Sequence, residues 1–262
     1  MLSTMAESHK RGAMFDENIV RTRLREAKWY AFDLDDTLHS FRKASAAAIT
    51  AVLRSIHEKS NLCCSLGDFE TEYKRILARG TASAFVDGKT SYQYREDRLQ
   101  QLVQKYDIEL YKGQMQLLLD CYENVLMNSL ELKTGVLDLL QTLKNYGHKI
   151  AVITEGPQDA QERTVEALGL TRYIDYLATT SKLRVARIDG MFVKVLDRLG
   201  LKPKDMIVIG DSWERDIVPA TQAGIYCVHY TEVDTGHDET MRINGFDMLE
   251  TLVEDAHRCS GA

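Results

Sequence analysis

The sequence predicts an α/β protein with a doubly wound parallel sheet and one all-helical insertion. Three short apolar runs, each followed by a small or acidic polar residue, have the pattern of strands buried on both faces; they are Trp29–Phe32, Ile150–Ile153 and Met206–Ile209. Helical patterns lie between the later runs, and alternating strands and helices are typical of right-handed crossovers in a parallel sheet. The stretch from 43 to 128 contains no strand-like run and is expected to be helical.

Two further strands complete the predicted sheet, Tyr176–Thr179 and Tyr226–Tyr230. The helices of the core are recognised from apolar side chains three and four residues apart, each series ending at a glycine; these glycines are Gly147, Gly169 and Gly200. Each glycine therefore marks the expected return of the chain towards the sheet.

The insertion repeats the helical spacing of apolar side chains from Ile49 to Ile56 and from Phe69 to Leu77, and two more helices are expected over 94–106 and 113–126. It divides the chain into a core of residues 1–42 and 129–262 and a helical cap of residues 43–128.

Composition limits the possible partners. The net charge of −6 leaves no basic excess for a nucleic acid polymer or an anionic membrane, and no apolar run reaches the length of a bilayer span. The first residues, 1–12, lack the apolar centre of a secretory signal, and the five cysteines have no metal-type spacing. We therefore expect a cytoplasmic protein with reduced thiols.

The clearest functional signal is a pair of acidic clusters at predicted strand ends. Asp33, Asp35 and Asp36 directly follow the first strand, and Asp211 and Asp216 follow the run that ends at residue 209. Because ligands of open parallel sheets bind at the carboxyl ends of the strands, we expect both clusters to meet at one crevice. Grouped carboxylates are costly to bury without a cation, and Mg²⁺ prefers oxygen ligands. A helix N-cap explains one such cluster, but hardly both.

On these residues the chain resembles the haloacid dehalogenase superfamily of hydrolases over nearly its whole length. The matching positions are Asp33, Asp35 and Thr37 of the Asp-x-Asp-x-Thr motif, Thr154 of the second motif, and Asp211 and Asp216 of the fourth motif. A helical cap inserted after the first motif of a Rossmann-like core is also a trait of that superfamily.

The resemblance implies a Mg²⁺-dependent phosphatase that works through a phosphorylated aspartate. Asp33 would be the nucleophile, and Asp35 would protonate the leaving oxygen and then activate water. Thr154 would hold phosphoryl oxygens. The implied metal ligands are Asp33, the backbone carbonyl of Asp35, Asp211 and Asp216, the last of them through water or by orienting the site.

The third motif departs from the superfamily pattern. Relatives usually carry a lysine ahead of the helix expected near Phe192, and no lysine stands there. Arg187 is the nearest cation and the favoured replacement, while Lys182 is its rival. A guanidinium can neutralise both the nucleophile and a phosphoryl oxygen, as a planar fork instead of a point charge. Glu155 stands where phosphatase relatives often carry asparagine; it is either a solvated acid or part of an altered substrate pocket.

The cap is expected to select the substrate, because the core motifs bind only the phosphoryl group. Arg95 and Arg98 are the predicted contacts, with Arg79 and Lys89 as further candidates, although each of these cations could equally be a solvated helix charge. We expect a small phosphorylated metabolite as the partner, and a monomer or homodimer.

Three alternatives stay open. Asp35 argues against a dehalogenase, which has no leaving alkoxide to protonate, but it is compatible with a phosphomutase or with another hydrolase of the superfamily, such as one that cleaves phosphonates. A regulatory relative that kept the fold and lost catalysis is the third, because the usual lysine is missing.

Overall fold

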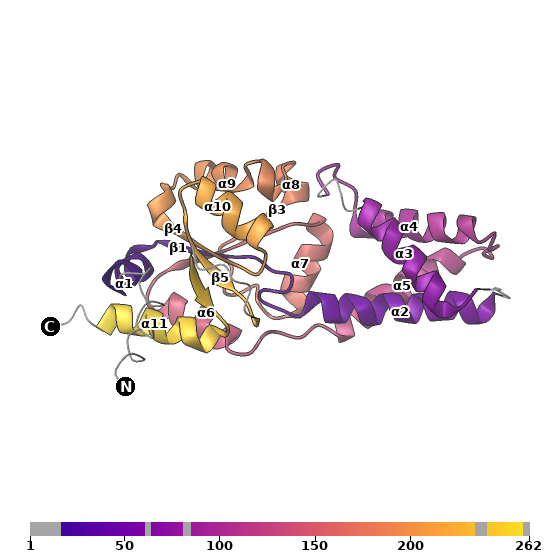
Figure 1. Cartoon of the computed structure of the whole chain (residues 1–262), viewed down its shortest axis with the longest axis horizontal. Coiled ribbons are helices and arrows are strands. Elements are labelled where there is room, and N and C mark those ends of the chain that lie inside the picture. Colours follow the sequence, from indigo (N-terminus) through magenta and orange to yellow (C-terminus); the bar gives the residue numbers. More distant parts are fainter. Residues whose placement is uncertain (1–16, 61–63, 81–84, 234–239, 259–262) are drawn as a thin grey trace, which may run out of the picture.

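A computed structural model describes residues 17–60, 64–80, 85–233 and 240–258 of the chain. A six-stranded parallel sheet forms the core, in the order β3-β2-β1-β4-β5-β6 (Figure 1). Its strands are β1 (Trp29–Phe32), β2 (Lys149–Thr154), β3 (Tyr176–Thr179), β4 (Met206–Gly210), β5 (Tyr226–Tyr230) and β6 (Met241–Ile243). The predicted fold class is confirmed, and all five predicted strands are present. The predicted absence of a secretory signal concerns residues 1–12, which lie outside the described ranges.

The central strand β1 is buried on both faces. Tyr30 and Phe32 enter one apolar core, and Trp29 and Ala31 enter the other, as the alternation of side chains along a strand requires. Helices cover both faces (Figure 1). The first core includes side chains of α1 (Glu17–Glu26), α6 (Val136–Asn145), α7 (Gln158–Ala167) and α11 (Phe246–Arg258), and the second those of α8 (Thr180–Leu183), α9 (Met191–Leu199) and α10 (Val218–Gln222).

The elements that the sequence analysis missed include α1, β6 and α11. Helix α1 buries only Val20 and Leu24 of its ten residues, and β6 has three residues, so neither carries a strong periodic signal. Helix α11 packs against α1 and α6 and was recognisable in principle from the spacing of Phe246, Leu249 and Val253.

The insertion between β1 and β2 is helical, as predicted, and forms a second body beside the sheet (Figure 1). It consists of α2 (Phe41–Lys59), α3 (Leu66–Gly80), α4 (Ser91–Lys105) and α5 (Gln114–Asn128). Its helices bury their own apolar cluster around Phe69, Leu99 and Leu102. The domain limits at 43 and 128 stay a prediction.

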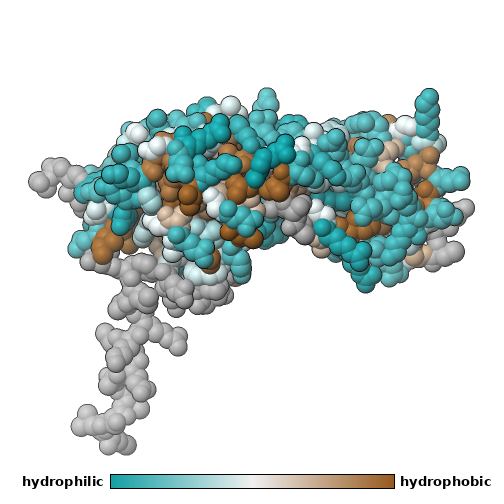
Figure 2. All heavy atoms as spheres, turned by 90° about the horizontal axis from the view of Figure 1, so that it is seen from above, coloured by the Kyte–Doolittle hydropathy of each residue, from teal (hydrophilic) through white to brown (hydrophobic). Residues whose placement is uncertain are grey.

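The face of the molecule seen in Figure 2 is mostly polar. Figure 2 shows hydrophilic side chains over most of both bodies, with apolar areas between them. Within the described ranges, no helix combines the length and the apolar character that crossing a bilayer requires.

Candidate active site

The loop after β1 returns the chain sharply into α2 and thereby presents its carboxylates at the sheet edge. The Asp33 N–H extends the sheet ladder by donating to the carbonyl of Ile209 at 2.9 Å. Asp36 has φ 65°, in the left-handed region that aspartate tolerates better than most residues, and its N–H donates to the carbonyl of His39. The carboxylate of Asp36 accepts the N–H of Arg42 at 3.0 Å and so stabilises the first turn of α2.

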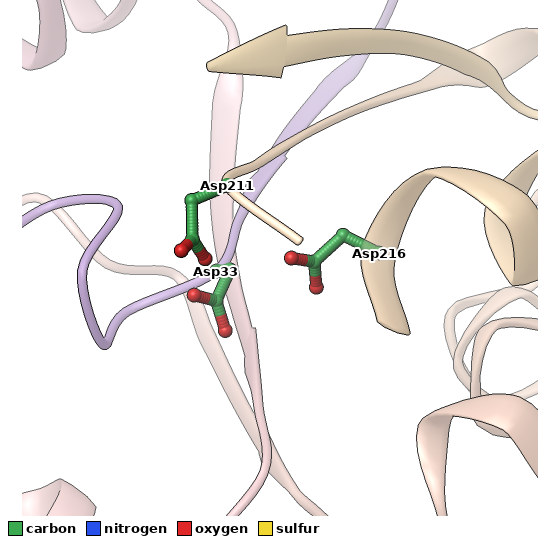
Figure 3. A group of neighbouring side chains, drawn as sticks. All are labelled: Asp33, Asp211 and Asp216. Carbon is green, nitrogen blue, oxygen red and sulfur yellow. The ribbon is translucent and has the colours of Figure 1, made fainter. Parts of the chain in front are cut away.

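Three carboxylates meet beyond the ends of β1 and β4. Oxygen atoms of Asp33, Asp211 and Asp216 all lie within 4.8 Å of one another, and Figure 3 shows the three groups converging. Thr37 links two of them, since its Oγ1 donates to Asp33 Oδ2 at 3.1 Å and accepts the N–H of Asp211 at 2.9 Å. The predicted convergence of the two acidic clusters is therefore present in the structure.

Asp216 reaches this point because the chain after β4 makes one π turn, η3 (Trp213–Ile217). The N–H of Ser212 donates to Asp216 Oδ2 at 3.0 Å and turns the carboxylate back towards the strand end. A Cβ at Gly210 would lie 2.5 Å from the Asp216 side chain. Only glycine therefore leaves room for this carboxylate.

Arg187 supplies the positive charge beside Asp33. It begins the short 3₁₀ helix η1 (Arg187–Asp189), and its Nη1 lies 2.6 Å from Asp33 Oδ1 and also contacts Asp216 Oδ1. Its side chain is 4% exposed. Lys182 is an exposed residue of α8 instead. Of the two rival cations, the structure places Arg187 on the predicted nucleophile; its catalytic role stays a prediction.

Glu155 lies beside the same arginine and not in open solvent. Its Oε2 is 3.7 Å from Arg187 Nε, and its side chain is 15% exposed. This placement favours the altered-pocket interpretation of Glu155 over the solvated-acid interpretation.

The acidic groups depend on nearby positive charge. Burial raises the pKa of Asp33 well above the usual carboxyl value; Arg187 opposes this rise, while Asp216, Asp35 and Asp211 add to it. Burial likewise raises the pKa of Asp216, again against the effect of Arg187. One guanidinium thus faces several carboxylates, and a further cation would favour their ionised forms.

The donor set suits Mg²⁺. Octahedral Mg²⁺ holds oxygen atoms at about 2.1 Å, so opposite ligands are about 4.2 Å apart. The Asp33, Asp211 and Asp216 oxygens all lie within 4.8 Å of one another, so small side-chain adjustments would bring them onto one ion. The carboxylate of Asp35 is not part of this group, which is compatible with the predicted use of its backbone carbonyl.

The Asp35 carboxylate is held by two side chains that the sequence analysis did not assign to the site. His39 Nε2 lies 3.0 Å from Asp35 Oδ1, and Gln161 Nε2, on α7, donates to Asp35 Oδ2 at 3.3 Å. His39 is fully buried, and Gln161 is 5% exposed. Nothing in the local sequence distinguishes Gln161 from the other polar residues of α7.

Thr154 is the last residue of β2, and its side chain is buried. It is completely inaccessible, and its Oγ1 has no hydrogen-bond partner in the part of the chain that the structure describes. An unpaired buried hydroxyl at this edge is available to a ligand oxygen, as the predicted phosphoryl contact requires.

A cavity of about 630 Å³ joins this edge of the core to the cap. Its core wall includes Asp35, Thr154, Glu155 and Arg187, and its cap wall includes Tyr73, Tyr94, Arg95, Arg98 and Tyr122. Of the four proposed cap cations, Arg79 and Lys89 do not line it, and Lys89 instead pairs with Asp97 at 2.9 Å. The cavity is therefore lined by predicted catalytic residues of the core and by two of the predicted substrate contacts of the cap, Arg95 and Arg98.

Known proteins are similar to this chain over most of its length. Residues 27–224 match the haloacid dehalogenase-like hydrolase family. The chain is 26% identical over 236 residues to the glyceraldehyde 3-phosphate phosphatase of Methanocaldococcus jannaschii, across 87% of this chain and 97% of that enzyme. It is 24% identical over 231 residues to the pyrimidine 5'-nucleotidase YjjG of Escherichia coli, across 86% and 97%. Both similarities therefore extend across core and cap.

Solved structures show the same fold. The magnesium-bound HAD-hydrolase YfnB of Bacillus subtilis superposes with a TM-score of 0.65 at 23% identity, covering 87% of this chain and 99% of YfnB. The 2-haloacid dehalogenase of Pseudomonas syringae gives 0.66 at 21% identity, with the same coverage. Because the similar proteins include both phosphatases and a dehalogenase, the activity has to be argued from the site.

Proposed function

The chain belongs to the haloacid dehalogenase-like hydrolases, and we propose that it is a phosphatase that hydrolyses small phosphate monoesters with Mg²⁺ through a phosphorylated Asp33. The observation that carries the proposal is the contact of buried Asp33 with Arg187 at the point where Asp211 and Asp216 converge. The names of the relatives, a sugar-phosphate phosphatase and a nucleotidase, support small phosphorylated metabolites as substrates.

In the proposed mechanism, Asp33 attacks phosphorus. As the bond from its carboxylate oxygen to phosphorus forms, the bond from phosphorus to the ester oxygen breaks, and the leaving oxygen takes a proton from Asp35. Arg187 favours the ionised form of Asp33 next to an anionic substrate, and Thr154 Oγ1 is available to hold a phosphoryl oxygen. Mg²⁺ held by Asp33, Asp211, Asp216 and the Asp35 carbonyl would supply further positive charge.

Asp35 serves both half-reactions. In the second, its carboxylate takes a proton from water as the water oxygen attacks phosphorus, and Asp33 leaves with inorganic phosphate as the product. His39 and Gln161 orient this carboxylate through contacts of 3.0 and 3.3 Å. Its position on the cavity wall, apart from the three converging carboxylates, suits a proton carrier better than a metal ligand.

Turnover of para-nitrophenyl phosphate tests the proposal. We expect hydrolysis with Mg²⁺, none in excess EDTA, and none for Asp33→Asn, which should fold normally because it removes one of several like charges. Mg²⁺ should also raise the melting temperature, since a ligand that binds only the folded state stabilises it. Full activity in EDTA, or wild-type activity of Asp33→Asn, would exclude this mechanism.

The covalent step has a separate readout. Denatured enzyme quenched during turnover should carry phosphate that hydroxylamine removes, as expected of an acyl phosphate, and Asp33→Asn should carry none. Transfer of the phosphate to a second hydroxyl of the substrate, instead of to water, would identify a phosphomutase.

A further inference from the structure

We propose that Arg98, on the cap wall of the cavity, forms a binding site for a second anionic group, so that the preferred substrate carries a carboxylate or another phosphate besides its ester phosphate. This inference rests on the proposed phosphatase function and names the substrate class of the same site.

Arg98 has unused hydrogen-bonding capacity inside the molecule. Its Nε and Nη2 are buried and have no hydrogen-bond partner in the part of the chain that the structure describes. Burying guanidinium N–H groups without acceptors is unfavourable. An anionic ligand group in the cavity would supply the missing acceptors.

Three other arginines of the cavity wall are already paired with carboxylates. Arg95 pairs with Glu123 and lies 4.2 Å above the ring of Tyr122. Arg163 contacts Glu123 and Asp159, and Arg187 contacts Asp33 and Asp216. The sequence analysis proposed Arg95 and Arg98 equally as substrate contacts. The structure distinguishes them, because Glu123 already balances the charge of Arg95.

Aromatic side chains surround Arg98. Its guanidinium lies 5.8 Å from the centre of the Tyr94 ring. It also lies beside the Tyr73 hydroxyl: burial raises the pKa of Tyr73 to about 12, and Arg98 acts against this rise. Tyr73 is therefore neutral and can donate a hydrogen bond together with Arg98. A guanidinium fork with a phenol beside it matches the oxygens of a carboxylate or a phosphate.

The second site opens into the same space as the proposed phosphoryl site. Arg98, Tyr73 and Tyr94 line the cavity that Thr154 and Arg187 also line. Its volume of about 630 Å³ is in the usual range for small-molecule ligands. A single metabolite can thus place its ester phosphate on the core and its second anion on the cap.

Two matched substrate pairs test the inference. Glycerol 3-phosphate and 3-phosphoglycerate differ by one carboxylate, and 3-hydroxypropyl phosphate and propane-1,3-diol bisphosphate differ by one phosphate. We expect wild-type kcat/KM to be higher for the member with the second anionic group in at least one pair. Arg98→Met should lower that preference ratio about 10- to 100-fold, as expected for the loss of a charge-assisted contact.

Arg79→Met is the matched control, because Arg79 is an exposed cation of the cap that does not line the cavity; its preference ratio should stay at the wild-type value. Arg98→Lys should recover part of the preference, and circular dichroism checks folding. The pair that responds identifies carboxylate or phosphate as the second anion. An unchanged ratio in Arg98→Met, or equal wild-type rates within both pairs, overturns the inference while leaving the phosphatase proposal intact. Failure of the phosphatase proposal is recognised separately, by a wild-type enzyme that hydrolyses no phosphate ester.

Discussion

At the scale of single residues, the two departures from the pattern of relatives are physically connected. Where relatives usually carry lysine and asparagine, this chain has Arg187 and Glu155, and the two side chains face each other at 3.7 Å. Arg187 contacts Asp33 through Nη1, and Glu155 lies on the side of its Nε. We interpret Glu155 as the carboxylate that balances the larger, always charged guanidinium.

The role of Arg187 is tested by its removal. Arg187→Ala should lower kcat/KM on the order of 10²-fold or more, because it removes the charge that favours ionised Asp33 and is expected to stabilise the transition state. Lys182→Ala should have a much smaller effect, since Lys182 is exposed on α8. Steady-state kinetics on one phosphate ester measures both, with circular dichroism as the folding control. An inactive Lys182→Ala beside a normal Arg187→Ala would contradict this assignment.

A double mutant tests the connection between Arg187 and Glu155. Arg187→Lys alone should lose activity, because a lysine that reaches Asp33 leaves Glu155 without its partner. Adding Glu155→Asn should restore activity towards the wild-type level, so that the loss in the double mutant is smaller than the sum of the two single losses. Strict additivity of the two substitutions in kcat/KM would mean that the side chains act independently.

At the scale of elements, the cap is attached to the core through the start of helix α4. Asp159, on α7, accepts the N–H of Ser91 at 2.9 Å and its hydroxyl at 2.7 Å. Arg163, one turn further along α7, donates to the Ser91 hydroxyl at 2.9 Å. A second contact joins Arg184 Nη1 to the backbone carbonyl of Asp87 at 3.1 Å. These bonds fix the cap wall over the carboxyl ends of the strands.

Substitution of Asp159 should loosen this attachment. Asp159→Ala removes two hydrogen bonds to Ser91, so we expect KM to rise about 10-fold, as for the loss of a hydrogen bond to a charged group. Glu166→Ala, at an exposed position of the same helix, is the control and should behave like wild type. Kinetics together with small-angle scattering checks the expected opening; an unchanged KM and an unchanged scattering profile for Asp159→Ala would contradict it.

At the scale of the whole molecule, the sheet domain and the cap have separate apolar cores, and residues of both line one cavity. The sheet has an apolar core on each face, and the cap has its own around Phe69, Leu99 and Leu102.

His148 lies where three distant segments of the sheet domain meet: its Nδ1 contacts the carbonyl of Ala27 at 2.7 Å, and its Nε2 lies 3.3 Å from His257 Nε2.

His148 should make the folded state sensitive to acid. Burial lowers its pKa below the usual 6.5, with His257 acting in the same direction and the Ala27 carbonyl opposing it. The unfolded chain therefore binds a proton at a higher pH than the folded chain does, so this contribution to stability is complete above about pH 6.5 and is lost as the pH falls towards the folded pKa.

Urea unfolding from pH 8 to pH 5 measures this effect. His148→Asn removes the titrating group but keeps an N–H that can reach the Ala27 carbonyl. We expect the variant to lose less free energy of unfolding between pH 7 and pH 5 than wild type does. Parallel curves for the two proteins would exclude His148 as the source.

The sequence by itself determined the parts of this protein that local patterns encode. Apolar runs located five strands, helical spacing located the insertion, and the rule that parallel strands end at one edge brought Asp33, Asp211 and Asp216 together. Each of these inferences needs only the pattern of one segment; β1 and β4, for example, are buried along their whole length.

Tertiary structure alone decided which side chains meet across segments. Arg187 and Lys182 are near in sequence, but only Arg187 turns inward to Asp33. Arg95 and Arg98 lie one turn apart on α4, yet Glu123 from α5 occupies the first and leaves two nitrogen atoms of the second without partners among the described residues. Gln161 reaches Asp35 from a helix more than a hundred residues away. Such pairings depend on how helices pack against each other, and no local periodicity records that.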